Sequence, residues 1–149
     1  MRKQRVRVLI DANIYLSFLV SPQNRSGSIE FLIEAAFTQR YRLLLPIDLI
    51  DEVAHSLETK PFFKQRVDPT TADQFLNAIK NVAEHIATPP GPLALVTRDP
   101  KDDYLIACAI SSETDYLVSG DKDLLVIGDT FHPLKIRTPS AFLPELDLF

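Results

Sequence analysis

The stretch VLIDANIYLSFLV, residues 8–20, decides the fold that the sequence predicts. Its first three residues continue an apolar, β-favouring run that begins at Val6 and stops at Asp11. From Ile14 to Val20 the residues are compatible with a helix. The stretch therefore predicts a strand, a short loop and a helix, with Asp11 at the carboxyl end of the strand.

The remainder of the chain repeats this alternation of short apolar strands with amphipathic helices. Apolar residues spaced three and four apart predict helices over residues 28–40, 47–57, 71–86 and 99–112. Further strands are predicted over residues 42–46, 116–119 and 134–137, and a helical turn over residues 121–126. The proline-rich segment 88–100 predicts a loop, with room for brief edge pairing over residues 93–96. We expect one α/β domain over residues 1–149, with a central parallel β-sheet flanked by helices on both faces.

Composition bounds the class of protein. With 149 residues, 46% hydrophobic and 24% charged, the chain matches one globular domain with a single core. Its one cysteine, Cys108, can form neither an internal disulfide nor a cysteine-rich metal site. The four glycines form neither a G-x-G pair nor a P-loop pattern. No stretch approaches the ~20 apolar residues of a membrane span and the first residues carry no cleavage site, so we expect a cytoplasmic protein with no membrane partner.

Acidic residues gather where the predicted strands end and the helices begin. Asp11 ends the first strand and Asp121 follows the strand at 116–119, while Asp103 opens one helix and Glu52 lies in the first turns of another. On a parallel sheet these positions share one edge. Carboxylates brought together there repel one another unless a cation lies between them, and their oxygens suit Mg²⁺ or Mn²⁺.

Such ions activate water against a phosphodiester, so the pattern is compatible with a nuclease. The net charge of −4 argues against broad neutralisation of nucleic-acid phosphates, but bound divalent cations supply positive charge locally. Each acid also has an ordinary structural role open to it. These roles are helix capping for Asp11, a solvated helix face for Glu52, the helix dipole for Asp102 and Asp103, and a turn around Gly120 for Asp121 and Asp123.

Four segments, in this order, carry a family resemblance. They are VLIDANIYLSFL (8–19), LLLPIDLIDEVAHSL (43–57), RDPKDDYLIACAI (98–110) and DYLVSGDKDLL (115–125). Together they resemble the motifs of PIN-domain ribonucleases, especially the bacterial branch that contains toxins of toxin–antitoxin pairs. The resemblance extends from about Val6 to Leu143. The D-x-N opening is common in proteins, whereas its combination with a D-x-x-I-A helix and a strand ending in S-G-D is quite specific.

The resemblance implies an endoribonuclease that depends on Mg²⁺ or Mn²⁺ and acts on RNA. By resemblance, the catalytic and metal-binding acids are Asp11, Glu52, Asp103 and Asp121, with Asn13 and Ser119 as polar supports. Asp123 is a further metal ligand to consider beside Asp121, and Asp102 stands beside Asp103, which the D-x-x-I-A spacing favours. The resemblance also implies a separate antitoxin protein as partner and a homodimer as one state to expect.

The other polar and reactive residues are weaker candidates for catalysis or binding. The three histidines have no spacing that suggests an acid–base pair, and Cys108 lies among apolar residues that predict burial. Arg98, Lys101 and Lys122 flank the acidic motifs and are candidates for phosphate contacts. Two other interpretations stay open: a receiver-like signalling domain that binds Mg²⁺, and a catalytically silent RNA- or protein-binding module of the same fold.

Overall fold

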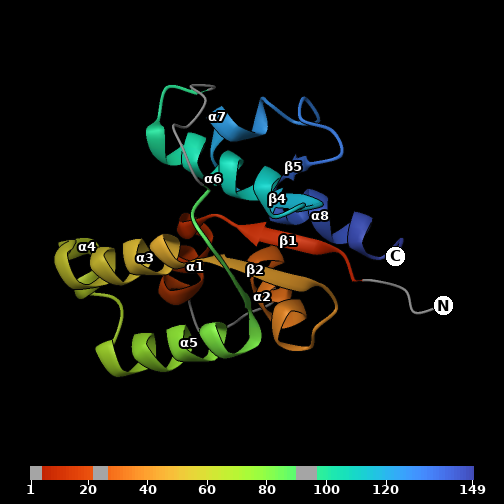
Figure 1. Ribbon diagram of the computed structural model, residues 1–149. Helices are drawn as coiled ribbons and strands as arrows, with labels where there is room; N and C mark the ends of the chain where they lie inside the picture. Colours follow the sequence, from red (N-terminus) through yellow and green to blue (C-terminus); the bar gives the residue numbers. More distant parts are fainter. Residues whose placement is uncertain (1–4, 22–26, 90–96) are drawn as a thin grey trace.

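Five parallel strands form the centre of the computed structural model, which describes residues 5–21, 27–89 and 97–149 (Figure 1). The strands in these residues are β1 (Arg7–Ile10), β2 (Arg42–Pro46), β3 (Glu84–Ile86), β4 (Tyr116–Val118) and β5 (Lys135–Arg137), in the sheet order β3-β2-β1-β4-β5. The eight helices of the same residues are α1 (Ala12–Val20), α2 (Ser28–Phe37), α3 (Ile47–Thr59), α4 (Pro61–Lys64), α5 (Pro69–Val82), α6 (Pro100–Ser111), α7 (Lys122–Leu125) and α8 (Pro139–Leu146). The predicted α/β class is confirmed.

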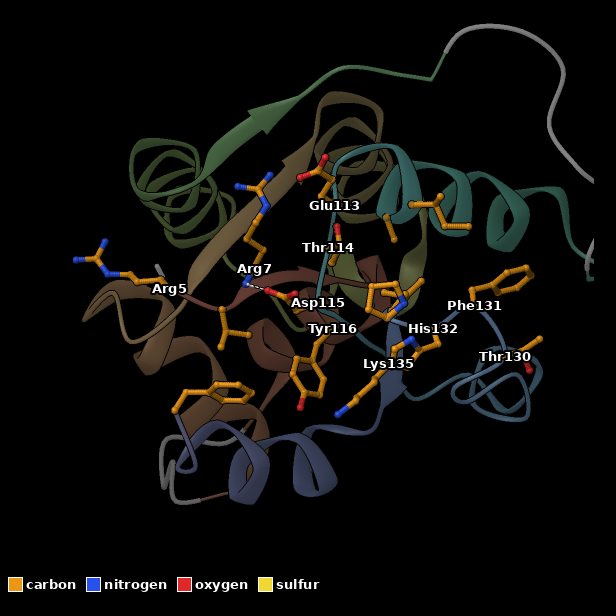
Figure 2. Close-up of a pocket in the computed structure, with 16 residues that line it drawn as sticks. Arg5, Arg7, Glu113, Thr114, Asp115, Tyr116, Thr130, Phe131, His132 and Lys135 are labelled. Carbon is orange, nitrogen blue, oxygen red and sulfur yellow. Dashed lines mark hydrogen bonds between the residues drawn. The ribbon is translucent and has the colours of Figure 1, made fainter. Parts of the chain in front are cut away.

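Strand β1 lies in the middle of the sheet. Its Val8 pairs with Leu43 of β2 on one side and with Tyr116 of β4 on the other. Val8 and Leu9 are fully buried, as expected for the central strand of a parallel sheet that is covered on both faces. Helix α6 covers one face of the sheet near β4, and α8 covers the other face (Figure 2).

The loop predicted after the first strand is replaced by one residue, Asp11, between β1 and α1. The Asp11 N–H donates to the carbonyl of Val118 at 3.0 Å, which extends the pairing with β4. The Asp11 carbonyl accepts the N–H of Ile14 at 3.0 Å, which starts the helix. Because both backbone groups are engaged, the direction of the Asp11 side chain is fixed, and this side chain makes no capping hydrogen bond.

The helix predicted over residues 71–86 is wrong at its end. Helix α5 stops at Val82, and the next residues form the edge strand β3. Ile86 lies four residues after Val82 and therefore continues the helical spacing, yet it is buried from an extended backbone. Strand β3 is held by charge as well as by pairing, because the Glu84 carboxylate accepts a hydrogen bond from Arg42 at 3.3 Å. That ion pair joins residues far apart in the sequence, which helical spacing cannot reveal.

The spacing also fails to predict helices α4 and α8. In α8, Thr138 caps the helix and Pro139 occupies its first turn, a start that the sequence signals. Pro144 inside the helix argues against it. Packing overrides this signal, because Phe142 is fully buried and its ring centroid lies 5.8 Å from that of Tyr41.

Residues 93–96, for which we predict brief edge pairing, lie outside the described residues. Within the described ranges, no helix combines the length and the apolar character needed to cross a membrane.

Two buried tyrosines differ in what their hydroxyl groups meet. Tyr15 is fully buried, and its hydroxyl has no hydrogen-bond partner among the described residues. Burial also raises the pKa of Tyr15. By contrast, the Tyr41 hydroxyl donates to the carbonyl of Leu32 at 2.6 Å. Removing each hydroxyl in turn therefore compares the effect on stability of a hydroxyl that has a hydrogen-bond partner with that of one that has none.

We expect Tyr15→Phe to leave the free energy of unfolding unchanged or to raise it by about 1 kcal/mol, because a buried hydroxyl without a partner costs desolvation. Tyr41→Phe, the matched control, should lower it by about 1–3 kcal/mol, because the Leu32 carbonyl loses its donor. Urea unfolding measures both. A Tyr15→Phe variant that is less stable than Tyr41→Phe would contradict this account of the core.

Candidate metal centre

Two cavities in the described part of the chain open at opposite ends of the sheet. The larger, about 960 Å³, lies at the amino ends of the strands (Figure 2). Two charged side chains there already have partners: the Asp115 carboxylate accepts the backbone N–H of Arg7 at 2.8 Å, and the Arg7 guanidinium donates to the Ser112 carbonyl at 2.9 Å. The smaller, about 700 Å³, lies at the carboxyl ends, where open parallel sheets bind ligands. Its position and lining make it the candidate site.

Carboxylates dominate the lining of the smaller cavity. They are Asp11, Asp48, Asp51, Glu52, Asp99, Asp102 and Asp121. Three of the four acids predicted as ligands, Asp11, Glu52 and Asp121, are therefore brought together at this edge of the sheet. Asn13 also lines the cavity, as an exposed residue in the first turn of α1. The structure thus places Asn13 at the rim of the cavity.

A buried serine connects the acids that follow β1 and β4. The Ser119 hydroxyl donates to Asp11 Oδ2 at 2.8 Å, and its oxygen accepts the N–H of Asp121 at 3.0 Å. Ser119 is completely buried and Asp11 is 7% exposed. Ser119 therefore fixes the carboxylate at the end of β1 and the backbone at the end of β4 relative to each other. This geometry suits the predicted supporting role of Ser119.

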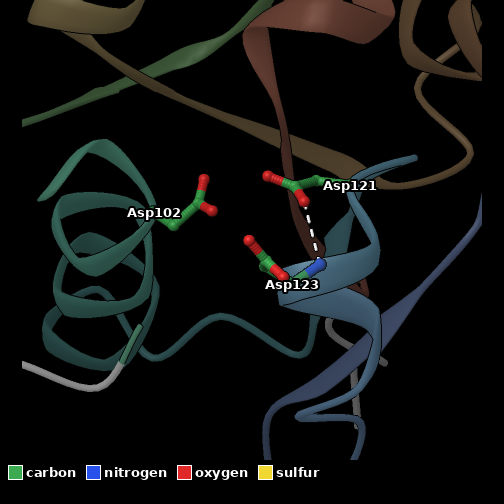
Figure 3. Close-up of side chains that lie close together, drawn as sticks. All are labelled: Asp102, Asp121 and Asp123. Carbon is green, nitrogen blue, oxygen red and sulfur yellow. Dashed lines mark hydrogen bonds between the residues drawn. The ribbon is translucent and has the colours of Figure 1, made fainter. Parts of the chain in front are cut away.

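Asp102, Asp121 and Asp123 form a compact group, which we call the three-aspartate group (Figure 3). One carboxylate oxygen from each lies within 4.8 Å of the other two. Asp121 caps helix α7, because its Oδ1 accepts the N–H of Asp123 at 2.9 Å. Asp102 approaches from the first turn of α6, on the other side of the gap (Figure 3). Asp121 thus combines the structural role expected for it at the turn around Gly120 with a place in the three-aspartate group.

Helix α6 presents Asp102, and not Asp103, to the cavity. Asp103 is also buried, but its Oδ1 accepts the N–H of Thr97 at 2.8 Å, on the turn that leads into the helix. Successive residues of a helix point about 100° apart, so the two carboxylates face different neighbours. Of the two neighbouring acids, Asp102 therefore lines the cavity, whereas Asp103 contacts the turn that leads into α6.

The apolar spacing of the sequence does not separate Asp102 from Asp103, whereas the observed burial of α6 does. The buried stripe of α6 contains Leu105, Ile106 and Ala109, which face the core. Asp102 precedes these residues by three, four and seven positions and therefore extends the same stripe toward the carboxyl edge of the sheet. Asp103 precedes Ile106 by three positions and Ile110 by seven, and Ile110 is 50% exposed, so Asp103 lies at the border of the buried stripe.

The acids of the cavity disfavour one another's charge. The pKa of Asp102 is raised from 3.8 to about 7, first by burial and then by a shared hydrogen bond with Asp121 and the negative charge of that residue. The pKa of Asp11 is also raised, chiefly by burial, with the charges of Asp121 and Glu52 adding to the effect and the Ser119 hydrogen bond opposing it. In the metal-free protein, a proton on Asp102 relieves part of this repulsion.

Two cations from the segment that precedes and begins α6 contact acids of this region, and one of them, Lys101, lines the cavity. Lys101 Nζ lies 2.9 Å from Glu52 Oε1, and an Arg98 guanidinium nitrogen lies 2.9 Å from Asp123 Oδ1. Lys122, the third predicted phosphate contact, makes no ion pair within the described residues.

Cys108 is fully buried, as predicted, and burial raises its pKa.

Comparison with known proteins places this geometry in a family. A family model described as PIN domain matches residues 7–123. The chain belongs to the PIN domain family. The uncharacterised protein MJ1680 of Methanocaldococcus jannaschii is 26% identical over 156 residues, covering all of this chain and 97% of that protein. The crystal structure of PAE2754 from Pyrobaculum aerophilum is 22% identical and matches 97% of this chain and 91% of that one with a TM-score of 0.64.

Membership of the PIN family, which generally has a metal-dependent nuclease fold, displaces the receiver-like interpretation. The archaeal relative lends no support to the bacterial toxin branch in particular.

This PIN domain has the donors that a hard divalent cation requires. The three-aspartate group supplies only oxygen atoms, which suit Mg²⁺ and Mn²⁺. Asp102 Oδ2 is buried, and no N–H or O–H of the described residues donates to it. A buried carboxylate oxygen that lies near other carboxylates and accepts no hydrogen bond is suited to bind a cation. The residues present therefore fit the metal that the family implies.

We predict that metal-free Asp102→Asn is more stable than the parent at about pH 8, and that this advantage shrinks toward about pH 5. The folded parent binds the Asp102 proton more tightly than the unfolded chain, since the pKa is raised to about 7. The parent therefore loses stability as the pH rises from about 4 through about 7, by an amount on the order of a few kcal/mol, and asparagine escapes this loss.

Urea unfolding in the presence of a chelator, across this pH range, measures the difference. Asp51→Asn is the control, because Asp51 also lines the cavity but is exposed. Parallel stability profiles for the parent and Asp102→Asn would contradict the assignment of a crowded, buried carboxyl.

Proposed function

We propose that this PIN domain is a metal-dependent endoribonuclease that hydrolyses phosphodiester bonds of RNA. The observation that carries the proposal is the three-aspartate group, whose oxygens lie within 4.8 Å of one another beside a cavity at the carboxyl edge of the sheet. Asp102 and Asp121 would hold a Mg²⁺ or Mn²⁺ ion, with Asp11, Glu52 and Asp123 as further acids of the site. This set replaces Asp103 of the sequence prediction by Asp102.

The bound ion would lower the pKa of a coordinated water and offset negative charge that develops on the phosphate. The chain itself supplies orientation. Ser119 holds the Asp11 carboxylate and the Asp121 backbone, so these two acids, which follow β1 and β4, keep their relative position. Asp102 would hold the ion as a carboxylate, without its proton. Attack by water with departure of the 3′ oxygen leaves a 5′ phosphate on one product and a 3′ hydroxyl on the other.

A narrower part of the proposal is the biological role. The resemblance of the sequence motifs to those of toxins supports a toxin that acts on cytoplasmic RNA, is inhibited by a separate antitoxin protein and forms a homodimer. Induced expression in a bacterial host should then arrest growth, and expression of Asp102→Asn should not. Normal growth with abundant, RNA-cleaving protein would contradict the toxin role and leave the nuclease in place.

The nuclease itself has a direct test. We expect the purified protein to cleave single-stranded RNA with Mg²⁺ or Mn²⁺, to leave 5′-phosphate ends and to be silent in excess chelator. Asp102→Asn and Asp121→Asn should each lower the cleavage rate about 10²–10³-fold, because each removes charge that positions the ion. Gel analysis of end-labelled RNA measures both rate and product ends.

Asp73→Asn is the control for this test, because Asp73 is exposed on α5 and does not line the cavity. It should cleave at the rate of the parent. Cleavage that persists in chelator, or products that end in a 2′,3′-cyclic phosphate, would refute the metal-dependent mechanism.

A further inference from the structure

The turn that leads into α6 is tied down by its own side chains. Asp103 Oδ1 accepts the N–H of Thr97 at 2.8 Å, and Asp99 Oδ1 accepts the N–H of Lys101 at 3.0 Å as the cap of the helix. The Thr97 hydroxyl also accepts the N–H of Asp99 at 3.2 Å. Asp103 therefore has a defined task outside the metal centre, because it holds the turn that carries Arg98 and Lys101.

This fixed turn directs its two cations to different acids of the proposed site. Lys101 contacts Glu52 of α3, and Arg98 contacts Asp123 of α7, each at 2.9 Å. Both cationic side chains are mostly exposed, at 72% for Lys101 and 87% for Arg98. Exposed ion pairs of this kind are weak and easily exchanged. The cations thus partly neutralise the acids of the metal-free site without locking it.

A divalent ion and these two cations compete for the same negative charge. An ion held at this site would offset the charges of Glu52 and Asp123, so the attraction of both acids for Lys101 and Arg98 would fall. Both cations would remain on the segment held by Asp103 and Asp99, at the edge of the proposed site, where they would be available to RNA phosphates. Arginine and lysine side chains are the common protein donors to nucleic-acid phosphates.

We propose that Arg98 and Lys101 exchange partners during function, from the acids of the metal-free site to RNA phosphates once the ion is bound. The inference rests on the proposed nuclease function and adds a mechanism by which metal binding strengthens RNA binding. In this scheme Arg98 and Lys101 contact the RNA backbone directly. Because coupling between two ligands is reciprocal, RNA also strengthens metal binding through the same two side chains.

The first test measures Mn²⁺ affinity without RNA, by isothermal titration calorimetry. Arg98→Gln and Lys101→Gln should each bind Mn²⁺ about two- to fivefold more tightly than the parent, because the competing cation is gone. Lys122→Gln is the matched control: it removes the same charge between Asp121 and Asp123, but from a side chain without an ion pair in the described residues. Mn²⁺ affinities of Arg98→Gln and Lys101→Gln no tighter than that of Lys122→Gln would overturn the exchange.

The second test measures binding of a phosphorothioate-linked single-stranded oligoribonucleotide by fluorescence anisotropy, with and without Mn²⁺. In chelator, the Arg98→Gln/Lys101→Gln double variant should match the parent within about twofold, since both cations are then occupied. With Mn²⁺ it should bind about five- to twentyfold more weakly, with a salt slope reduced by about 1.4 for two lost phosphate contacts on a single strand.

Equal weakening with and without Mn²⁺ would show that the two cations contact phosphate at all times and would overturn the inference. Failure of the proposed function has a different signature, because the parent itself would then bind no Mn²⁺ or cleave no RNA.

Discussion

Pairing between β1 and β4 continues one residue beyond the strands, where the Asp11 N–H donates to the Val118 carbonyl at 3.0 Å. This hydrogen bond brings together segments that are far apart in the sequence and sets the relative position of Asp11 and Ser119. The Ser119 hydroxyl then fixes the Asp11 carboxylate, and its oxygen receives the Asp121 N–H. Asp102 and Asp123 complete the site only because α6 and α7 start at this same edge.

The acids gathered at the carboxyl edge of the sheet serve the proposed function but lower the stability of the metal-free fold. Strand residues such as Val8 and Leu117 are fully buried and supply apolar stabilisation, while the adjoining edge holds carboxyl groups whose charges repel. The metal-free protein reduces this repulsion with a proton on Asp102, the Ser119 hydroxyl and two exposed cations. A divalent ion can replace these weaker compensations, which gives the proposed metal a role in folding stability as well as in chemistry.

Much of the fold could be predicted from the sequence, because apolar runs and helical spacing report local structure directly. Strand β1 and helix α6 are examples, the latter marked by Asp99 and Pro100 at its start. Helical spacing does not predict strand β3, because Ile86 fits a helical stripe and the ion pair of Glu84 joins the strand to Arg42, which is distant in the sequence.

The candidate site was predictable to a similar extent. The order of the motifs predicts that Asp11, Glu52 and Asp121 lie at one edge of the sheet, because each stands at the end of a strand or near the start of a helix. All three line the same cavity. The choice between Asp102 and Asp103 depends on the rotation of α6 about its axis. That rotation is set by packing of Leu105 and Ala109 against the core, which a linear motif does not report.

Anomalous diffraction from crystals grown with Mn²⁺ tests the central claim most directly. The account predicts a manganese peak bonded to carboxylate oxygens of Asp102 and Asp121, with the Asp103 carboxylate still accepting the Thr97 N–H. A peak bonded to Asp103 in place of Asp102, or no peak at the carboxyl edge of the sheet at saturating Mn²⁺, would contradict it.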